Sequence, residues 1–255
     1  MAEIVCNGLT KVFAGGLSAL DRIDLRLAAG RTTALLGPSG CGKSTLLRLI
    51  AGLEEPTTGA VLIDGRPPEA LCRQGGLSIA FQDPCLLPWL TVRRNVALGR
   101  RLARQAPDPQ AVDRMIHLVG LGGFQEARPA ALSGGMRQRA AIARALVTAP
   151  RVLLLDEPFG ALDALTRRQL AQDLPPLWRR QQATTLLVTH SVDEAVMLAD
   201  RILVLSPRPA HVLADLDVGL PASRDGESPA FRSLAAKVLA LLMRGGEQAQ
   251  AVAAQ

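Results

Sequence analysis

The sequence predicts an α/β fold with a parallel sheet, a small antiparallel sheet near the N-terminus and a helical lobe inserted into the core. Three observations support this prediction. Short apolar strands alternate with helix-like segments at both ends of the chain, the middle is mostly helical, and a glycine-rich loop joins an early strand to a helix. With 255 residues and 48% hydrophobic composition, the chain can bury a sizeable core, so we expect one domain.

Residues 1–83 predict the antiparallel sheet and the beginning of the parallel core. Strand-like alternation runs through Ile23–Leu27, and a second strand, Val61–Ile63, enters an Asp-Gly turn. Between them, Thr32–Leu36 is an apolar strand that leads into the glycine-rich loop. A helix should follow, with apolar residues spaced i, i+3, i+4 and i+7: Leu46, Leu49, Ile50 and Leu53.

Residues 84–149 are predicted to form the helical lobe. A helix behind the Asp108 cap places four apolar residues on one face: Val112, Met115, Ile116 and Val119. Residues 150–220 then return to the core, where alternation with helices predicts parallel strands at Val152–Leu155, Thr185–Val188 and Ile202–Leu205. We expect a capped helix at Ser191 and Glu194, and an amphipathic helix and tail over 221–255.

Composition and charge argue against several classes of protein. The net charge of +6 comes with scattered arginines, no Tyr, five Phe and two Trp, so we expect a solvated basic surface and no nucleic-acid partner. No stretch approaches the roughly 18 apolar residues of a spanning helix, and the start has no basic-then-apolar leader. The four cysteines form no CxxC pair and lack a histidine at zinc spacing. These features favour the cytoplasm.

The strongest chemical motif is Gly37-Pro-Ser-Gly-Cys-Gly-Lys-Ser44, between a predicted strand and a predicted helix. Its glycines let backbone N–H groups turn toward phosphate oxygens, and the helix N-terminus adds its positive dipole. Lys43, expected to be exposed, should reach the outer phosphates, and Ser44 should offer its hydroxyl to Mg²⁺. Cys41 is either an activated thiol or a small filler. The predicted phosphate-binding residues are contiguous: Gly37, Pro38, Ser39, Gly40, Cys41, Gly42, Lys43, Ser44 and Thr45.

Two carboxylates follow the apolar strand Val152–Leu155, at its carboxyl end. Asp156 suits the coordination shell of Mg²⁺, and Glu157 can orient and polarise water for in-line attack on a γ-phosphate. Taken alone, the pair also fits an ordinary junction between a strand and a turn. Together with the glycine-rich loop, it predicts a nucleotide-hydrolysis site.

The segment Leu132-Ser-Gly-Gly-Met136 opens a helix shortly before Asp156. Ser133, Gly134 and Gly135 can present a second phosphate-binding helix end, although a plain helix cap is the simpler interpretation. In this order, the motifs resemble those of the ABC ATPase family. The resemblance implies a P-loop NTPase (RecA-like) core with an N-terminal antiparallel β subdomain and an inserted helical signature subdomain. It also implies that the signature segment faces ATP held by a second copy.

The resemblance extends from Phe13 to about Leu205 and assigns roles to four more residues. Phe13 resembles the aromatic residue that stacks on adenine, and Gln82 resembles the lid glutamine near Mg²⁺ and water. Asp163 resembles the acidic residue of the dimer-facing loop, and His190 the switch histidine near the γ-phosphate. Read singly, these four residues are more simply a core aromatic, a solvated glutamine, a helix cap and a structural histidine.

The stretches Phe81–Val92 and Asp156–Asp163 are similar to those of importer subunits for nitrate, sulfonate and taurine. The resemblance implies an Mg²⁺-dependent ATPase on the inner face of the membrane, working with a second and identical copy, an integral membrane permease and, indirectly, an external solute-binding protein. We expect permease contact at an apolar cluster that otherwise seats the lobe on the core: Leu86, Leu87, Pro88, Trp89 and Leu90.

Two rival functions and one departure from the family pattern remain. A non-transport ABC ATPase acting on ribosomes or DNA usually carries two cassettes or long inserted arms, and this chain has one loop and one signature. A P-loop kinase or small GTPase would lack the signature at Leu132. Pro175 and Pro176 lie inside what the family would make one helix, so we expect a kink or break there.

Overall fold

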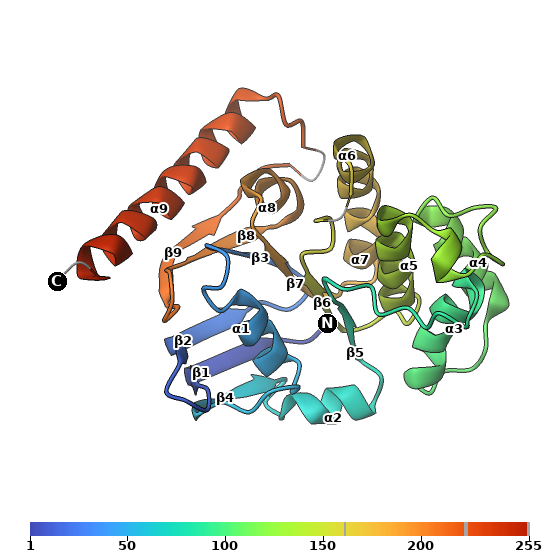
Figure 1. The fold of residues 1–255 in the computed structure, drawn as a ribbon, viewed down its shortest axis with the longest axis horizontal. Helices are drawn as coiled ribbons and strands as arrows, with labels where there is room; N and C mark the ends of the chain where they lie inside the picture. Colours follow the sequence, from blue (N-terminus) through green and yellow to red (C-terminus); the bar gives the residue numbers. More distant parts are fainter. Residues whose placement is uncertain (161, 222–223, 254–255) are drawn as a thin grey trace.

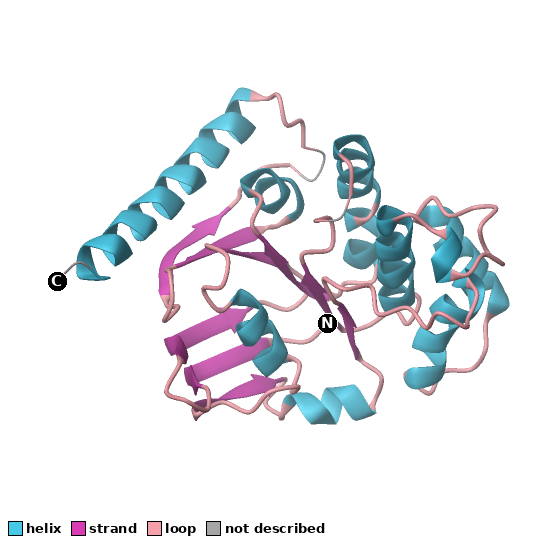
Figure 2. Cartoon of the chain, in the orientation of Figure 1, coloured by secondary structure: helices cyan, strands magenta, loops and turns pink. Residues whose placement is uncertain are grey.

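The computed structural model describes residues 1–160, 162–221 and 224–253. Ala161 of the predicted dimer-facing loop and residues 222–223 of the predicted tail lie outside the described residues. Two sheets and a group of helices make up the molecule (Figure 1), and Figure 2 distinguishes the helices from the strands.

The N-terminal sheet has three antiparallel strands in the order β2-β1-β4. They are β1 (Ile4–Val12), β2 (Ser18–Leu27) and β4 (Thr58–Ile63). The predicted alternation is confirmed, because Ile23, Leu25 and Leu27 are buried while Asp24 and Arg26 are exposed.

The core sheet has six strands in the order β5-β6-β7-β3-β8-β9. Its strands are β3 (Thr32–Leu36), β5 (Leu77–Ala80), β6 (Val152–Asp156), β7 (Thr184–Thr189), β8 (Arg201–Leu205) and β9 (Val212–Asp217). All neighbours pair in parallel except β8 and β9, which are antiparallel. The predicted parallel sheet is therefore confirmed, and β5 and β9 are additions to it.

Helix α1 (Lys43–Ile50) follows β3 and begins at the lysine of the glycine-rich loop. The prediction that Leu53 continues its apolar face is wrong. Gly52 has φ +69°, and the N–H of Leu53 donates to the carbonyl of Arg48, which closes the helix end. Leu53 is consequently 56% exposed. A short helix, α2 (Pro68–Arg73), follows β4.

The helical lobe contains α3 (Val92–Leu102), α4 (Pro109–Leu118) and α5 (Gly134–Leu146), which stand together at the right of Figure 1. Asp108 caps α4 as predicted, because its side chain accepts a hydrogen bond from the N–H of Ala111. The predicted apolar face of α4 is buried, with Val112 and Ile116 almost fully enclosed. The lobe shares a continuous hydrophobic cluster with the core strand β6.

The proline pair breaks its helix, as predicted. Helix α6 (Ala164–Asp173) ends before Leu174, and α7 (Pro175–Arg180) begins at the first proline. The break lets α7 bury Trp178, whose indole N–H donates to the Thr32 hydroxyl of β3 at 3.2 Å. The proline pair therefore fits the packing of α7 against the core.

Two helices cover the remaining face of the core sheet near β8. Helix α8 (Val192–Leu198) contributes Ala195 and Val196 to a cluster that also buries Phe231 and Val238 of α9 (Pro229–Ala253). Figure 1 shows α9 on the opposite side of the molecule from the lobe. Within residues 1–160, 162–221 and 224–253, no helix is both long and apolar enough to cross a membrane.

Candidate active site

The glycine-rich loop joins β3 to α1 at the carboxyl edge of the core sheet. Gly42 has φ +127°, and a Cβ there would lie 2.8 Å from the carbonyl oxygen of Ala19, so only glycine fits. Contrary to prediction, Lys43 is only 5% exposed. Its Nζ donates to the carbonyls of Gly37 at 2.8 Å and Pro38 at 2.9 Å, which explains the burial.

Cys41 fills space inside this loop. Its side chain is buried, and a Cβ added to Gly37 would approach its sulfur to 3.0 Å. Burial raises the pKa of the Cys41 thiol, although the nearby Lys43 opposes this rise. The interpretation as a small filler is therefore favoured over an activated thiol.

Ser44 and Asp156 meet beside the loop because parallel strands β3 and β6 end at the same edge of the sheet. The Ser44 hydroxyl donates to Asp156 Oδ1 at 3.0 Å. Asp156 is almost completely buried, and burial raises the pKa of its carboxyl while the hydrogen bond from Ser44 lowers it.

This pair of oxygen ligands fits Mg²⁺. The described residues include no cluster of three or more His, Cys, Asp or Glu side chains that could hold a metal by themselves. Mg²⁺ is commonly held by one or two protein oxygens together with substrate phosphates. A hydroxyl and a carboxylate in contact, at the first turn of the helix predicted to bind phosphate, match that requirement.

Glu157 lies next along the chain in a strained conformation. Its φ is +47°, in the left-handed region that non-glycine residues seldom adopt. Its N–H donates to the carbonyl of Val188 in β7 at 2.9 Å, which ties the turn to the neighbouring strand. In this conformation the carboxylate contacts residues from two other segments.

Gln82 and His190 both contact the Glu157 carboxylate. Gln82 Nε2 donates to Glu157 Oε2 at 3.3 Å, and His190 Nδ1 lies 3.3 Å from the same oxygen. Gln82 belongs to residues 81–91, which connect β5 to α3 and which we call the lid segment. In the part of the chain that the structure describes, the Gln82 amide therefore contacts Glu157 and not the Ser44–Asp156 pair.

The burial of the Glu194 carboxylate, four residues after His190, was not predicted from the sequence. Ser191 caps α8 as expected, since its hydroxyl accepts from the N–H of Glu194. The Glu194 carboxylate does not complete a reciprocal cap. It accepts a 2.6 Å hydrogen bond from the Thr189 hydroxyl, which in turn accepts from the N–H of Ser191. Burial raises the pKa of the Glu194 carboxyl. Its signal in the sequence was identical to that of an ordinary capping residue.

The signature residues lie apart from this group. Ser133 caps α5, with its hydroxyl accepting from the N–H of Met136 at 3.2 Å, and its side chain is exposed. Gly134 and Gly135 form the first turn of the same helix. Figure 1 shows α5 in the lobe and α1 in the core, so one chain does not bring these two helix ends together.

Phe13 and Asp163 have local roles in the described contacts. Phe13 packs half-buried against the core, and Lys11 Nζ lies 5.0 Å from its ring centroid. Asp163 caps α6, because its Oδ1 accepts from the N–H of Thr166 at 2.9 Å. These contacts match the simpler interpretations of both residues and leave their proposed nucleotide roles as predictions.

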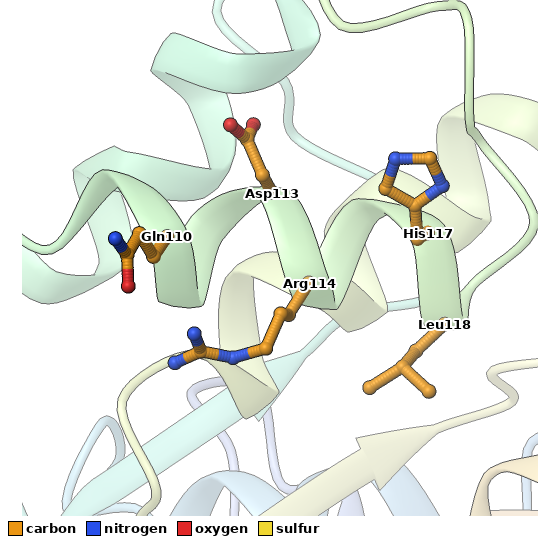
Figure 3. A pocket seen from close by; sticks show the side chains of 5 residues that line it. All are labelled: Gln110, Asp113, Arg114, His117 and Leu118. Atoms are coloured by element: carbon orange, nitrogen blue, oxygen red, sulfur yellow. The ribbon is translucent and has the colours of Figure 1, made fainter.

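A separate hollow lies along α4, and Figure 3 shows the side chains that line it. None of the predicted site residues lines it; the lining residues are Gln110, Asp113, Arg114, His117 and Leu118. Asp113 is paired with Arg93 of α3. The hollow is therefore distinct from the edge of the sheet where phosphate binding is predicted.

Comparison with known proteins places this geometry among ATP-binding cassettes. A sequence profile of the family described as ABC transporter matches residues 20–160. The aliphatic sulfonates import ATP-binding protein SsuB 1 of Pseudomonas savastanoi pv. phaseolicola is 48% identical over 229 residues, covering 90% of this chain and 91% of that protein. The nitrate import ATP-binding protein NrtC of Synechocystis is 47% identical over 220 residues, covering 82% of this chain and 32% of that protein.

A solved structure agrees with the sequence relatives. It is a dimeric ATP-binding cassette in a post-hydrolysis state, bound to ADP and Pi. It superposes with a TM-score of 0.78 at 30% identity, and the match covers 86% of this chain and all of that one. At this identity, the likeness extends beyond general fold.

Proposed function

The chain belongs to the ABC transporter family, as an ATP-hydrolysing cassette, and from its site we propose that it energises uptake of a small sulfonate, nitrate or similar anion through a separate permease. The observation that carries the catalytic part is the convergence of Gln82 and His190 on one oxygen of Glu157, beside the Ser44–Asp156 pair. The solute class rests on the names of the sulfonate and nitrate relatives.

Within one chain, the residues divide the work of hydrolysis. The loop amides and the N-terminus of α1 bind the phosphates, and Lys43 Nζ exchanges its carbonyl partners for outer phosphate oxygens. Ser44 and Asp156 would hold Mg²⁺, which when bound neutralises phosphate charge. Glu157 orients the attacking water and accepts its proton, while His190 and Gln82 fix the carboxylate.

A second copy of the chain completes the site. The exposed cap residue Ser133 and the amides of Gly134 and Gly135 bind ATP held by the loop of the partner. Support comes from the separation of the two helix ends in Figure 1 and from the dimeric state of the related cassette. ATP then favours the closed dimer, and hydrolysis releases it.

The permease contact belongs to the lid segment. Trp89 is 66% exposed, whereas Leu86 packs against the lobe and core cluster. The apolar stretch was expected either to contact the permease or to seat the lobe on the core. We assign the packing role to Leu86 and the permease contact to the exposed Trp89. The chain would act on the inner face of the membrane, and an external solute-binding protein would deliver the anion to the permease.

Purification from native membranes tests this function. A tagged chain should recover an integral membrane protein, and in liposomes its ATPase rate should rise when a loaded solute-binding protein is added. Lys43→Ala is the matched control for ATP dependence. Recovery of ribosomes or DNA, without a membrane protein, would support the non-transport alternative instead.

A further inference from the structure

Two side chains of α5 hold the first half of the lid segment by its backbone. Arg144 donates from Nη1 to the carbonyl of Cys85 and from Nη2 to the carbonyl of Pro84, each at 2.7 Å. Gln138 Nε2 donates to the carbonyl of Phe81 at 3.1 Å. These three carbonyls flank Gln82 on both sides, so the backbone that carries Gln82 is attached to α5.

Burial of these side chains restricts the attachment. Gln138 is fully buried, and Arg144 is half-buried, with burial lowering the pKa of its guanidinium. A planar guanidinium that serves two carbonyls has a fixed orientation. Helix α3 also presses on this turn of α5, since a Cβ on Gly99 would lie 2.3 Å from the Arg144 carbonyl oxygen. The turn of α5 that carries Arg144 is therefore closely packed against α3. We call Arg144 and Gln138, with their hydrogen bonds to the lid segment, the clamp.

The second half of the lid segment is held by α3. The buried Asn95 donates from Nδ2 to the carbonyls of Leu87, Leu90 and Thr91, and its Oδ1 accepts from the N–H of Leu87. The lid segment leaves the core strand β5, but these contacts bind it to the lobe. Gln82, through its 3.3 Å contact with Glu157, is then the point where this lobe-bound segment reaches the catalytic carboxylate.

We propose that Arg144 and Gln138 are positioning residues that set the contact between Gln82 and Glu157, so that α5 links the signature end of a chain to that chain's own catalytic carboxylate. Ser133 caps the N-terminus of α5, and the helix carries both clamp residues. A displacement of the helix when Ser133 meets the partner's nucleotide would move the lid segment with it. This inference rests on the proposed roles of Gln82 and Glu157.

A double-mutant cycle tests the clamp. Arg144→Ala should lower kcat by about tenfold to a hundredfold, because a small misplacement of a reacting group is costly. The Kd for ATP should stay unchanged, since the glycine-rich loop is untouched. In a Gln82→Ala background, adding Arg144→Ala should change kcat by less than about twofold, because the clamp acts through Gln82. Arg144→Lys keeps the positive charge but cannot donate to both carbonyls in the planar geometry of a guanidinium, so its kcat should lie between those of Arg144→Ala and the parent. If Arg144→Ala does not fold, Arg144→Lys replaces it in the double-mutant cycle.

Arg139 provides the matched control. It lies on the same helix and donates from Nη1 to the carbonyls of Val119 and Gly120, in the lobe and away from the lid segment. If Arg139→Ala lowers kcat, the double variant with Gln82→Ala should show the product of the two single fold-losses, because the two residues act independently. If the fold-loss in kcat of Arg144→Ala is the same in the parent and in the Gln82→Ala background, the clamp is refuted and Arg144 has only a structural role. If Gln82→Ala alone leaves kcat unchanged, the proposed role of Gln82 fails first, and the inference fails with it.

Discussion

Two helix N-termini in this chain carry serine and glycine, yet their surroundings differ. At α1, Ser44 of the first turn donates a hydrogen bond to the buried Asp156, and Glu157 follows Asp156 along the chain. At α5, Ser133 is exposed and its hydroxyl is used to cap its own helix. The first helix end contacts a carboxylate of the proposed hydrolysis site in the same chain, and among the described contacts the second does not.

The difference indicates what each end needs. A phosphate bound at α1 would lie close to the oxygen pair that we propose holds Mg²⁺ and to the carboxylate that we propose orients water. A phosphate bound at α5 has to arrive with another molecule, because its own chain does not bring a catalytic group to it. The comparison therefore leads to a site shared between two copies, and the following predictions test its two halves.

The largest expected effect is at the α1 end. Glu157→Gln removes the proton acceptor but keeps the shape and the phosphate contacts, so kcat should fall by about 10² to 10⁴ while ATP still binds. The unhydrolysed nucleotide should make the closed dimer accumulate, which gel filtration with Mg-ATP measures. A variant that hydrolyses ATP at near the parent rate would show that Glu157 is not the base.

Lys43→Ala should act on binding rather than on the chemical step. Loss of a charged hydrogen bond to phosphate should weaken ATP binding by about 10- to 100-fold, measured by calorimetry. Because Lys43 also donates to Gly37 and Pro38, a modest fall in Tm should accompany the loss, with the fold retained. Unchanged ATP affinity would contradict the assignment of this lysine.

Trp89→Ala should weaken assembly with the permease and leave the isolated ATPase intact. Truncating an aromatic anchor commonly costs about 2 kcal/mol or more, or about 30-fold in affinity. The exposed Trp89 contributes little to the folded core, so basal ATPase and Tm should be preserved. Normal permease retention with normal transport would remove Trp89 from the interface.

The smallest expected effects are on stability, and they have opposite signs at the two ends. Asp156→Asn should raise the Tm of the nucleotide-free chain, because burial raises the pKa of this carboxyl and its ionised form is costly. Since the folded chain retains the proton to higher pH than the unfolded chain, this cost is absent below the ordinary Asp pKa of 3.8 and grows as pH rises above it.

Ser133→Ala, by contrast, should lower the free energy of unfolding by about 0.5–2 kcal/mol through loss of the α5 cap. Thermal melts of the two variants at pH 7 and at pH 4 measure both effects. A gain in stability for Asp156→Asn that persists undiminished at the lower pH would contradict the electrostatic explanation.

Local patterns predicted the elements that carry strong periodicity or turn chemistry. Short or irregular features were harder: β5 has only four residues, and β9 follows a proline-rich loop that hid its pairing with β8. Leu53 matched the helical period, but the positive φ of Gly52 ends α1 before it. In each case, a single backbone conformation or a tertiary contact decided the outcome.

The site was predictable in composition and not in geometry. The motifs named Gln82, Glu157 and His190, but their convergence depends on the strand order of the core sheet and on the positive φ of Glu157. The contacts of Arg144 and Gln138 with the lid segment had no sequence signal, because they are made to backbone carbonyls that any residue type supplies.

Mixing two inactive variants tests the shared site most directly. Ser133→Arg should retain ATP binding in the monomer and lose turnover, while Lys43→Ala should bind ATP about 10- to 100-fold more weakly and lose turnover at ATP concentrations below its Kd. A mixed dimer contains one intact pair, with Lys43 from the first chain and Ser133 from the second. ATPase activity should therefore return on mixing and rise with the concentration of either variant. No recovery, with mixed dimers demonstrated by differential tags, would contradict a site built from two copies.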